Sequence, residues 1–355
     1  MTAQFKGYAV ESASTWDRPK VLEIEPPPFG PFDVDVKIRY CGVCGSDLLT
    51  VQANEGNDNW PGTAYPIVVG HEIVGEAVRV GEKVSKIRPG QIVGVGVLSS
   101  TCGTCRLCNS DRENYCSSLV ETYNSKYSDG SISHGGYANY KRIHEDFVFV
   151  IPEGLELTTA APLLCAGLTV YAPLEQAKVG PAHRVGVIGI GGLGHFAILF
   201  AQAMGATVTA ISHSENKRAD CEKMGVSKFI NTSVSETWVQ DNAKNLDILI
   251  STTFADDFAL ESYLELLDVG GRLVILGLSE SKLPRIPAGL LIGSNLTIVG
   301  SMIGSKTQME RMLALAAKID MRAWVEVMPM RDCGKALEKV ASGKARYRCV
   351  LEADL

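Results

Sequence analysis

Short apolar runs alternate with longer amphipathic runs through the second half of the chain, beginning at Arg184. Runs of these lengths predict strands and helices in turn. A strand, a helix and a second strand in that order form a parallel βαβ unit with a right-handed crossover. The sequence therefore predicts an α/β fold built on a doubly wound parallel sheet. Predicted strands cover 184–190, 207–212, 247–251 and 272–277, and predicted helices cover 193–204, 216–224 and 257–267.

A glycine-rich turn joins the first of these strands to the first helix. It has the pattern GxGxxG and contains Gly189, Gly191, Gly192, Leu193 and Gly194. Such glycines allow a tight turn and close backbone approach, and the helix start offers amide donors to a pyrophosphate. This position in a βαβ unit predicts a dinucleotide-binding Rossmann domain. The alternative is that these glycines serve only strand and helix packing.

The first 155 residues are strand-like instead, with β-branched runs at 34–41, 73–81 and 91–98. After residue 295 follow a predicted strand at 296–301, a helix at 307–318 and a short strand at 347–351. A length of 355 residues suggests two domains. We predict a strand-rich catalytic domain at 1–157, the dinucleotide domain at 158–295 and a tail at 296–355. The tail closes the parallel sheet and then returns to the first domain.

Four cysteines lie close together in one polar segment. Cys102, Cys105, Cys108 and Cys116 supply enough thiolates for a closed tetrahedral zinc site, which leaves no position for substrate. Such an ion would supply folding energy to a segment that has little apolar material. Free or disulfide-paired cysteines are the alternative.

A second group of possible ligands is scattered along the chain and comprises Cys44, His71, Glu72 and Cys165. Taken singly, His71 is more often an ordinary strand histidine, and Cys165 is more often a buried core residue. Together they have the ligand chemistry of an open, catalytic zinc site. Two thiolates and a neutral imidazole offset the charge of the ion, so a bound alkoxide would add one negative charge.

The composition narrows the possible partners and location. The formal net charge is −6, and the 34 Lys and Arg residues form no basic run, so we expect no nucleic-acid partner. The amino terminus has no export or organelle signal pattern. Glycines and His195 interrupt the longest apolar segment, 185–203, so we expect no membrane span and a cytoplasmic protein.

Several motifs together resemble the zinc-dependent medium-chain alcohol dehydrogenases. They are CGVCGSD at 41–47, VVGHEIVGE at 68–76, the four-cysteine segment, AAPLLCAGLTVY at 160–171, VGVIGIGGLGH at 185–195 and KARYRCVLE at 344–352. Within that family, GSMIGS at 300–305 and RYR at 346–348 resemble the cinnamyl-alcohol-dehydrogenase-like branch. The resemblance implies a GroES-like fold for the catalytic domain.

The resemblance also implies roles for the scattered ligands. Cys44, His71 and Cys165 are then the catalytic zinc ligands, and Glu72 takes the fourth position when substrate is absent. Asp47 is then the carboxylate that orients His71. A homodimer joined through the strand at 296–300 is implied by the family alone.

The end of the second predicted strand bears on the choice of dinucleotide. An NAD site usually places an acidic residue there, whereas this chain has Ser212. Ser212, His213 and Lys217 can donate hydrogen bonds to a 2′-phosphate, which predicts NADP(H). Lys217 as a solvated helix charge is the alternative. By resemblance, Thr169 contacts the nicotinamide, Arg348 reaches the pyrophosphate, and the cofactor cleft is lined by Ser301, Gly304 and Ser305.

These features predict an NADP-dependent alcohol dehydrogenase that works mainly as an aldehyde reductase. Ser46 is placed to give the proton in reduction, although a role in turn chemistry alone stays open. Many relatives carry a proton-relaying histidine where this chain has Leu49, so we expect the proton to leave through Ser46, the ribose hydroxyls and water. Leu49 and Trp60 predict a roomy apolar pocket for aromatic or medium-chain aldehydes, unless Trp60 is only a loop anchor.

Two other functions remain as alternatives. A polyol dehydrogenase of the same superfamily is disfavoured because those relatives commonly carry a carboxylate where this chain has Cys165. A catalytically silent, zinc-stabilised NADPH-binding protein is the alternative from another functional class.

Overall fold

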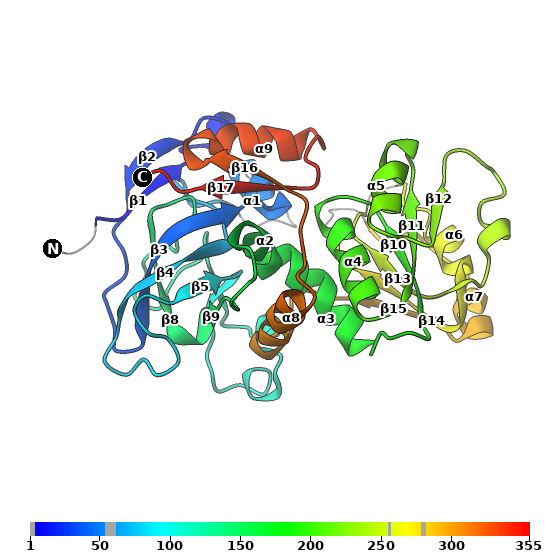
Figure 1. The fold of residues 1–355 in the computed structure, drawn as a ribbon, viewed down its shortest axis with the longest axis horizontal. Helices are drawn as coiled ribbons and strands as arrows, with labels where there is room; N and C mark the ends of the chain where they lie inside the picture. Colours follow the sequence, from blue (N-terminus) through cyan, green and yellow to red (C-terminus); the bar gives the residue numbers. More distant parts are fainter. Residues whose placement is uncertain (1–3, 54–61, 255–256, 278–281) are drawn as a thin grey trace. The chain divides into compact units, whose positions relative to one another are not determined.

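A computed structural model describes residues 4–53, 62–254, 257–277 and 282–355 of the chain. The chain divides into two compact units (Figure 1). The first combines Met1–Leu168 with Gly304–Leu355, and the second is Thr169–Ile303.

The second unit is built on a parallel six-stranded sheet with the strand order β12-β11-β10-β13-β14-β15. Strand order reverses beside β10, which confirms the doubly wound α/β fold. Figure 1 shows α4 on one side of these strands and α6 with α7 on the other. The strands are β10 (Arg184–Ile188), β11 (Thr207–Ser212), β12 (Lys228–Asn231), β13 (Leu246–Ser251), β14 (Leu267–Ile275) and β15 (Thr297–Gly300), and the helices are α3 (Leu168–Gln176), α4 (Gly192–Ala203), α5 (Arg218–Lys223), α6 (Leu260–Glu265) and α7 (Ala288–Ser294).

The first unit is built on a seven-stranded sheet with the path β16-β17-β3-β4-β5-β9, and β8 pairs with β3. Alternating side chains of β3, at Val34, Val36 and Ile38, are buried in its core. The strands are β1 (Lys6–Ala9), β2 (Lys20–Glu23), β3 (Asp33–Gly42), β4 (Ile73–Val80), β5 (Ile92–Val95), β6 (Leu98–Ser100), β7 (Val120–Glu121), β8 (Tyr140–His144), β9 (Val148–Val150), β16 (Val325–Pro329) and β17 (Arg348–Glu352), and the helices are α1 (Gly45–Val51), α2 (Leu157–Pro162), α8 (Lys306–Lys318) and α9 (Cys333–Ala341).

The two units divide at Leu168/Thr169 and Ile303/Gly304. The first division lies later in the chain than the 157/158 boundary that the sequence suggested, whereas the tail at 296–355 is shared between the units, with β15 in the six-stranded sheet. The difference arises because α2 packs against β3, β4 and β17 of the first unit. A change from strand-like to alternating sequence marks where helices begin, and it does not show which sheet the first helix covers.

Several predicted elements are corrected in detail. The strand predicted at 91–98 divides into β5 and β6, and the helix predicted at 257–267 is only α6. Strand β12 escaped prediction because only Ile230 is buried in it, so it has no apolar run. Helix α1 stands where the sequence suggested a turn.

One helical run, Leu157–Gln176, is long and apolar enough to cross a membrane. It differs from the segment 185–203 that the sequence singled out. Of its most apolar window, 83% is buried inside the protein, which is typical of a core helix.

Candidate metal centres and nucleotide-binding turn

Four possible metal ligands converge in the first unit from three separate parts of the chain. Cys44 precedes α1, His71 and Glu72 precede β4, and Cys165 lies between α2 and α3. One ligand atom from each lies within 4.8 Å of all the others, and all four residues are buried. The Sγ atoms of Cys44 and Cys165 are 3.8 Å apart. Zinc–sulfur bonds of about 2.3 Å in a tetrahedron place two sulfurs about 3.8 Å apart, so this pair fits zinc.

The local fold places each ligand for a physical reason. Cys165 lies in a π-helical turn, Leu163–Gly167. Such wide turns are rare and frequently occur at functional sites. Asp47 links the other two ligand segments, because its Oδ2 accepts a hydrogen bond from the Cys44 amide at 2.9 Å and its Oδ1 accepts one from the Gly70 amide at 3.2 Å.

Asp47 was expected to orient His71, and its contacts show an indirect way of doing so. Hydrogen bonds to its carboxylate come from the Cys44 and Gly70 amides, from the Tyr137 hydroxyl at 2.9 Å and from Tyr123. It therefore holds the backbone beside His71 rather than the imidazole, while its negative charge favours a protonated His71.

The charges of the centre suit a cation. The hydrogen bond from Cys165 lowers the pKa of the Cys44 thiol well below its usual value, against the effect of burial. A lower pKa favours the thiolate, which is the form that binds metal. Burial opposes protonation of His71, but Cys44 raises its pKa to about 9.

Glu72 forms a buried ion pair that the sequence did not indicate. Its Oε1 accepts a hydrogen bond from Nη2 of Arg348, and both side chains are almost fully buried. Its Oε2 is buried without a hydrogen-bond partner among the described residues. Burial raises the pKa of Glu72 to about 8, although the charge of Arg348 opposes the shift. An orphaned carboxylate oxygen in this cluster fits the expected role of Glu72 beside zinc. The contact of Arg348 with a pyrophosphate stays a prediction.

Ser46 lies beside this cluster, with its Oγ 3.4 Å from Nε2 of His71. Tyr123, which the sequence gave no reason to select, donates a hydrogen bond to the same Oγ at 3.4 Å. Leu49 lies on α1 with 42% of its side chain exposed. Trp60, the other residue predicted for the substrate pocket, lies outside the described residues. The pocket therefore stays a prediction.

The four-cysteine segment forms a second possible zinc site in the first unit. Neighbouring sulfurs of Cys102, Cys105, Cys108 and Cys116 lie 3.6–3.9 Å apart, and their ligand atoms all lie within 4.8 Å of one another. These distances match the edge of about 3.8 Å of a zinc–thiolate tetrahedron. Backbone amides at Thr104 and Cys105 lower the pKa of Cys102 to about 6. The four residues fit a closed structural site.

Replacing Cys102 by serine should lower the folding stability of this segment more than it lowers the catalytic rate. Serine binds zinc poorly, and structural zinc contributes folding energy directly. We expect one zinc fewer per chain and a lower melting temperature, measured by metal analysis and thermal unfolding. Cys221→Ser is the matched control, because Cys221 is a buried thiol outside both clusters. Unchanged zinc content and melting temperature in Cys102→Ser would exclude a structural ion.

The glycine turn of the second unit has the geometry that a dinucleotide needs. Gly189 has φ of +84°, which few other residues adopt. A Cβ on Gly194 would lie 2.0 Å from the carbonyl oxygen of Gly189, so this position requires glycine for close packing. A Cβ on Gly191 would meet nothing within 4 Å. Because Gly191 has no side chain and the space beside it is open, a phosphate can approach the backbone amides at the start of α4.

The residues predicted to bind a 2′-phosphate follow β11. Ser212 is 8% exposed, and its Oγ accepts a hydrogen bond from the Ser214 amide at 3.2 Å. His213 is exposed and Lys217 is half-buried. Arg218 pairs with Glu215 of the same turn, so the charge of this carboxylate is compensated. The structure keeps Ser212, His213 and Lys217 in one short segment, and their role stays a prediction.

The other predicted cofactor residues fall in both units. Thr169 and Ser301 lie in the second unit, and Gly304 and Ser305 begin the returning segment of the first. Ser305 is buried, and its Oγ accepts a hydrogen bond from the Gln308 amide at the start of α8. It therefore caps a helix, a role that the sequence did not indicate. The contacts of these residues with a cofactor are untested.

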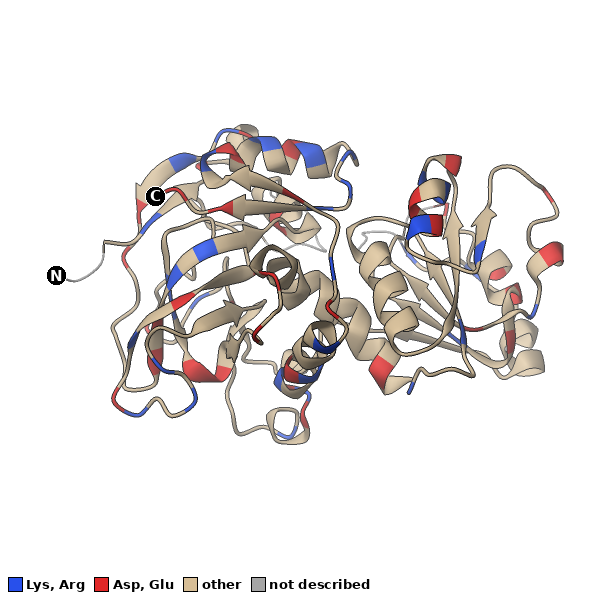
Figure 2. Cartoon of the chain, in the orientation of Figure 1, with Lys and Arg blue, Asp and Glu red and all other residues tan. Residues whose placement is uncertain are grey.

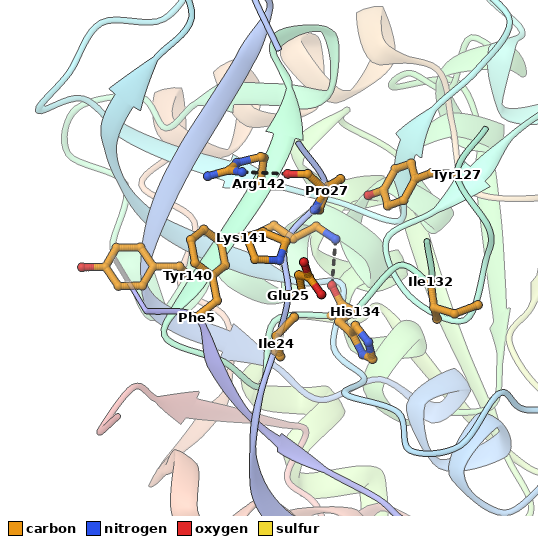
Figure 3. Close-up of a pocket in the computed structure, with 12 residues that line it drawn as sticks. Phe5, Ile24, Glu25, Pro27, Tyr127, Ile132, His134, Tyr140, Lys141 and Arg142 are labelled. Atoms are coloured by element: carbon orange, nitrogen blue, oxygen red, sulfur yellow. Dashed lines mark hydrogen bonds between the residues drawn. The ribbon is translucent and has the colours of Figure 1, made fainter. Parts of the chain in front are cut away.

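Two cations, Lys141 and Arg142, line a pocket outside the zinc clusters (Figure 3). Nζ of Lys141 donates a hydrogen bond to the carbonyl oxygen of His134, also in the pocket, at 2.7 Å, and another to that of Thr122 at 2.8 Å. Burial lowers the pKa of Lys141. Arg142, also in this pocket, donates to the carbonyl of Pro27 at 2.7 Å. These cations already bind the protein's own backbone, and Lys141 fixes the residue that precedes Tyr123.

Comparison with known proteins decides the family. The Alcohol dehydrogenase GroES-like domain model matches residues 30–153, and the Zinc-binding dehydrogenase model matches residues 192–318. The NADP-dependent alcohol dehydrogenase 6 of Saccharomyces cerevisiae is 40% identical over 98% of this chain and 96% of its own length. The chain belongs to the zinc-dependent medium-chain alcohol dehydrogenase family. Its predicted GroES-like and dinucleotide-binding domains are thereby confirmed.

Other relatives of the present chain are named as cinnamyl alcohol dehydrogenases. A probable cinnamyl alcohol dehydrogenase 3 of Oryza sativa subsp. japonica is 39% identical over 91% of this chain and 87% of its own length. The solved cinnamyl alcohol dehydrogenase of Sorghum bicolor has a TM-score of 0.91 and 35% identity, covering 99% of this chain and 98% of that one. A Helicobacter pylori enzyme solved with NADP(H) has a TM-score of 0.88 and 33% identity, covering 99% of both chains.

Proposed function

We propose that this protein is a zinc-dependent oxidoreductase that transfers hydride between NADP(H) and a primary alcohol or aldehyde. It acts mainly as a reductase of aromatic, cinnamaldehyde-like, or medium-chain aldehydes. The observation that carries the proposal is the buried cluster of Cys44, His71, Glu72 and Cys165, whose ligand atoms lie within 4.8 Å of one another. The relatives named as NADP-dependent and cinnamyl alcohol dehydrogenases support the cofactor and the substrate class.

Different residues of the site serve carbonyl polarisation, hydride transfer and proton transfer. Cys44, His71 and Cys165 would hold a zinc ion, which would supply Lewis-acid polarisation of a carbonyl oxygen, and bound NADPH would supply the hydride. Ser46, 3.4 Å from His71, is the hydroxyl that gives a proton to the developing alkoxide. Glu72, itself one of the four possible ligands, forms a buried ion pair with Arg348. Burial of the ligands limits competition from water.

The absence of a histidine at position 49 shapes the proton path. Leu49 has no titratable group, so the proton taken up by the substrate must come to Ser46 by another route. We propose the ribose hydroxyls and water as that route. The exposure of Leu49, 42%, is compatible with solvent near this part of α1.

The decisive test is a zinc count combined with an aldehyde panel assayed with NADPH and with NADH. We expect two zinc ions per chain and NADPH oxidation with cinnamaldehyde-like or medium-chain aldehydes. Turnover of sugar alcohols alone would favour a polyol dehydrogenase. Two zinc ions and bound NADPH without turnover on any aldehyde would favour a silent NADPH-binding protein and contradict the proposal.

Replacing Ser212 by aspartate should shift the preference from NADP(H) to NAD(H). A carboxylate repels a 2′-phosphate and accepts hydrogen bonds from the ribose hydroxyls. It can still accept the hydrogen bond from the Ser214 amide, so the turn should survive. We expect kcat/KM for NADPH to fall on the order of 100-fold, because like charges cost several kcal/mol. Ser212→Ala is the control for loss of the hydroxyl alone. Unchanged preference in Ser212→Asp would place phosphate recognition elsewhere.

We further propose a cytoplasmic homodimer that uses no nucleic-acid or membrane partner. Strand β15 is at the edge of the six-stranded sheet, and its Val299 is 39% exposed. Ile292 of α7, the helix that precedes β15 in the chain, is also apolar and is 80% exposed. Strand addition across a two-fold axis would cover such an edge. Figure 2 shows acidic and basic residues interspersed along α8 and α9, which does not favour a nucleic-acid surface.

A further inference from the structure

Tyr123 touches two members of the zinc centre in different ways. Its ring stacks on the imidazole of His71, with centroids 5.2 Å apart and an interplanar angle of 13°. Its hydroxyl donates a hydrogen bond to Oγ of Ser46 at 3.4 Å. The side chain is 3% exposed, so both contacts are shielded from water. One side chain therefore connects the metal-ligand histidine with the proposed proton donor.

The hydrogen bond from Tyr123 limits where the Ser46 proton can point. A serine hydroxyl has one hydrogen and two acceptor lone pairs, and it rotates freely unless a neighbour fixes it. The hydrogen bond runs from the Tyr123 hydroxyl to Oγ of Ser46, so the phenol is the donor here. When Tyr123 donates to one lone pair of Ser46, the serine hydrogen must point away from the phenol.

We propose that Tyr123 is a positioning residue that fixes the direction of the Ser46 hydroxyl during proton transfer. The inference rests on the proposed function, in which Ser46 transfers a proton to the substrate oxygen. The contact of 3.4 Å is longer than an average O–H···O bond of about 2.7–2.8 Å. Such bonds are often long in ligand-free sites and shorten when substrate binds.

The surroundings of Tyr123 keep it in place. Thr122, the preceding residue, donates its amide to the Val97 carbonyl at 2.8 Å, and its hydroxyl donates to the Gly96 carbonyl at 2.6 Å. Lys141 binds the carbonyl of Thr122 at 2.8 Å. Three hydrogen bonds therefore fix the backbone beside Tyr123. A side chain held this firmly can orient Ser46, since catalytic groups keep their geometry when the residues around them are rigid.

The test is a double-mutant cycle between Tyr123 and Ser46. Tyr123→Phe keeps the ring on His71 and removes the hydrogen bonds that the phenol makes with Ser46 and with Asp47, and the Ser46→Ala background isolates the first of these. We expect kcat for aldehyde reduction to fall about tenfold, the value of one hydrogen bond, with the aldehyde KM and the zinc content unchanged. In a Ser46→Ala background the same change should lower kcat less than twofold, because the hydroxyl to be oriented is gone.

Two further variants separate positioning from structural support. Tyr8→Phe is the matched control, because it removes a hydroxyl that binds Asp354 at 3.0 Å, outside the zinc centre. Its kcat should equal that of the wild type. Tyr123→Leu removes the stacked ring as well, so chelators should extract the catalytic zinc about tenfold faster than from Tyr123→Phe.

The outcomes distinguish this inference from the proposed function. If the wild type turns over aldehydes and Tyr123→Phe lowers kcat by the same factor with and without Ser46, Tyr123 does not act through Ser46. An unchanged kcat in Tyr123→Phe would likewise overturn the inference and leave the proposed function standing. No turnover in the wild type would overturn both. Equal zinc loss from Tyr123→Leu and Tyr123→Phe would exclude a role for the ring in holding His71.

Discussion

Replacing Ser46 by alanine should lower kcat for aldehyde reduction by about 10²–10⁴-fold. This factor is the usual contribution of a positioned acid or base. The substitution removes the hydroxyl that lies 3.4 Å from Nε2 of His71 and leaves the four metal ligands in place. Zinc content and the dissociation constant for NADPH should therefore stay unchanged. Steady-state kinetics, metal analysis and a fluorescence titration with NADPH measure the three quantities.

The conservative variant Ser46→Thr is the matched comparison for this result. Threonine keeps a hydroxyl on the same carbon, so it should recover most of the lost rate, within about tenfold of the wild type. Leu49 offers no proton donor that could replace the hydroxyl. A normal rate in Ser46→Ala would therefore show that water alone delivers the proton, and Ser46 would be left with a role in the turn before α1.

Replacing Gly194 by alanine should damage both stability and dinucleotide binding. The new Cβ would lie 2.0 Å from the carbonyl oxygen of Gly189, a backbone atom that cannot move without opening the turn. Thr252 holds the same carbonyl through its hydroxyl at 2.7 Å, so any shift also disturbs the loop after β13. We expect a loss of about 1–3 kcal/mol in the free energy of unfolding and no measurable NADPH binding.

Gly191→Ala is the contrasting variant in the same turn. No atom lies within 4 Å of the added carbon, and Gly191 has a φ of −128°, which alanine readily adopts. The free energy of unfolding should stay within about 0.5 kcal/mol of the wild type. The affinity for NADPH should nevertheless fall, because the methyl group occupies the space where the phosphate approaches. Denaturant unfolding and NADPH titration of both variants provide the comparison. Equal stability of the two variants would contradict the packing role of Gly194, and unchanged NADPH affinity in Gly191→Ala would move the phosphate away from this turn.

The sequence by itself determined features that depend on local spacing. The four cysteines at 102–116 are close enough in the chain to meet around one ion, whatever the rest of the fold does. The run of β-branched residues before the glycine turn predicted β10 and the start of α4. Strand β11 has the bounds that its sequence predicted, because its apolar residues form one uninterrupted run. The scattered ligands were identified from residue type and from family resemblance, not from spacing.

Tertiary structure decided everything that depends on contacts between distant residues. Glu72 and Arg348 are separated by 276 positions, and no periodicity relates them. Tyr123 and Ser46 are 77 positions apart and meet only because α1 and the segment that follows β7 belong to the same unit. Asp47 proved to hold the backbone of two ligand segments, which its place in the motif did not reveal. A local pattern fixes short elements through steric preference and apolar periodicity, whereas pairing of buried charges and hydroxyls follows from how the elements pack.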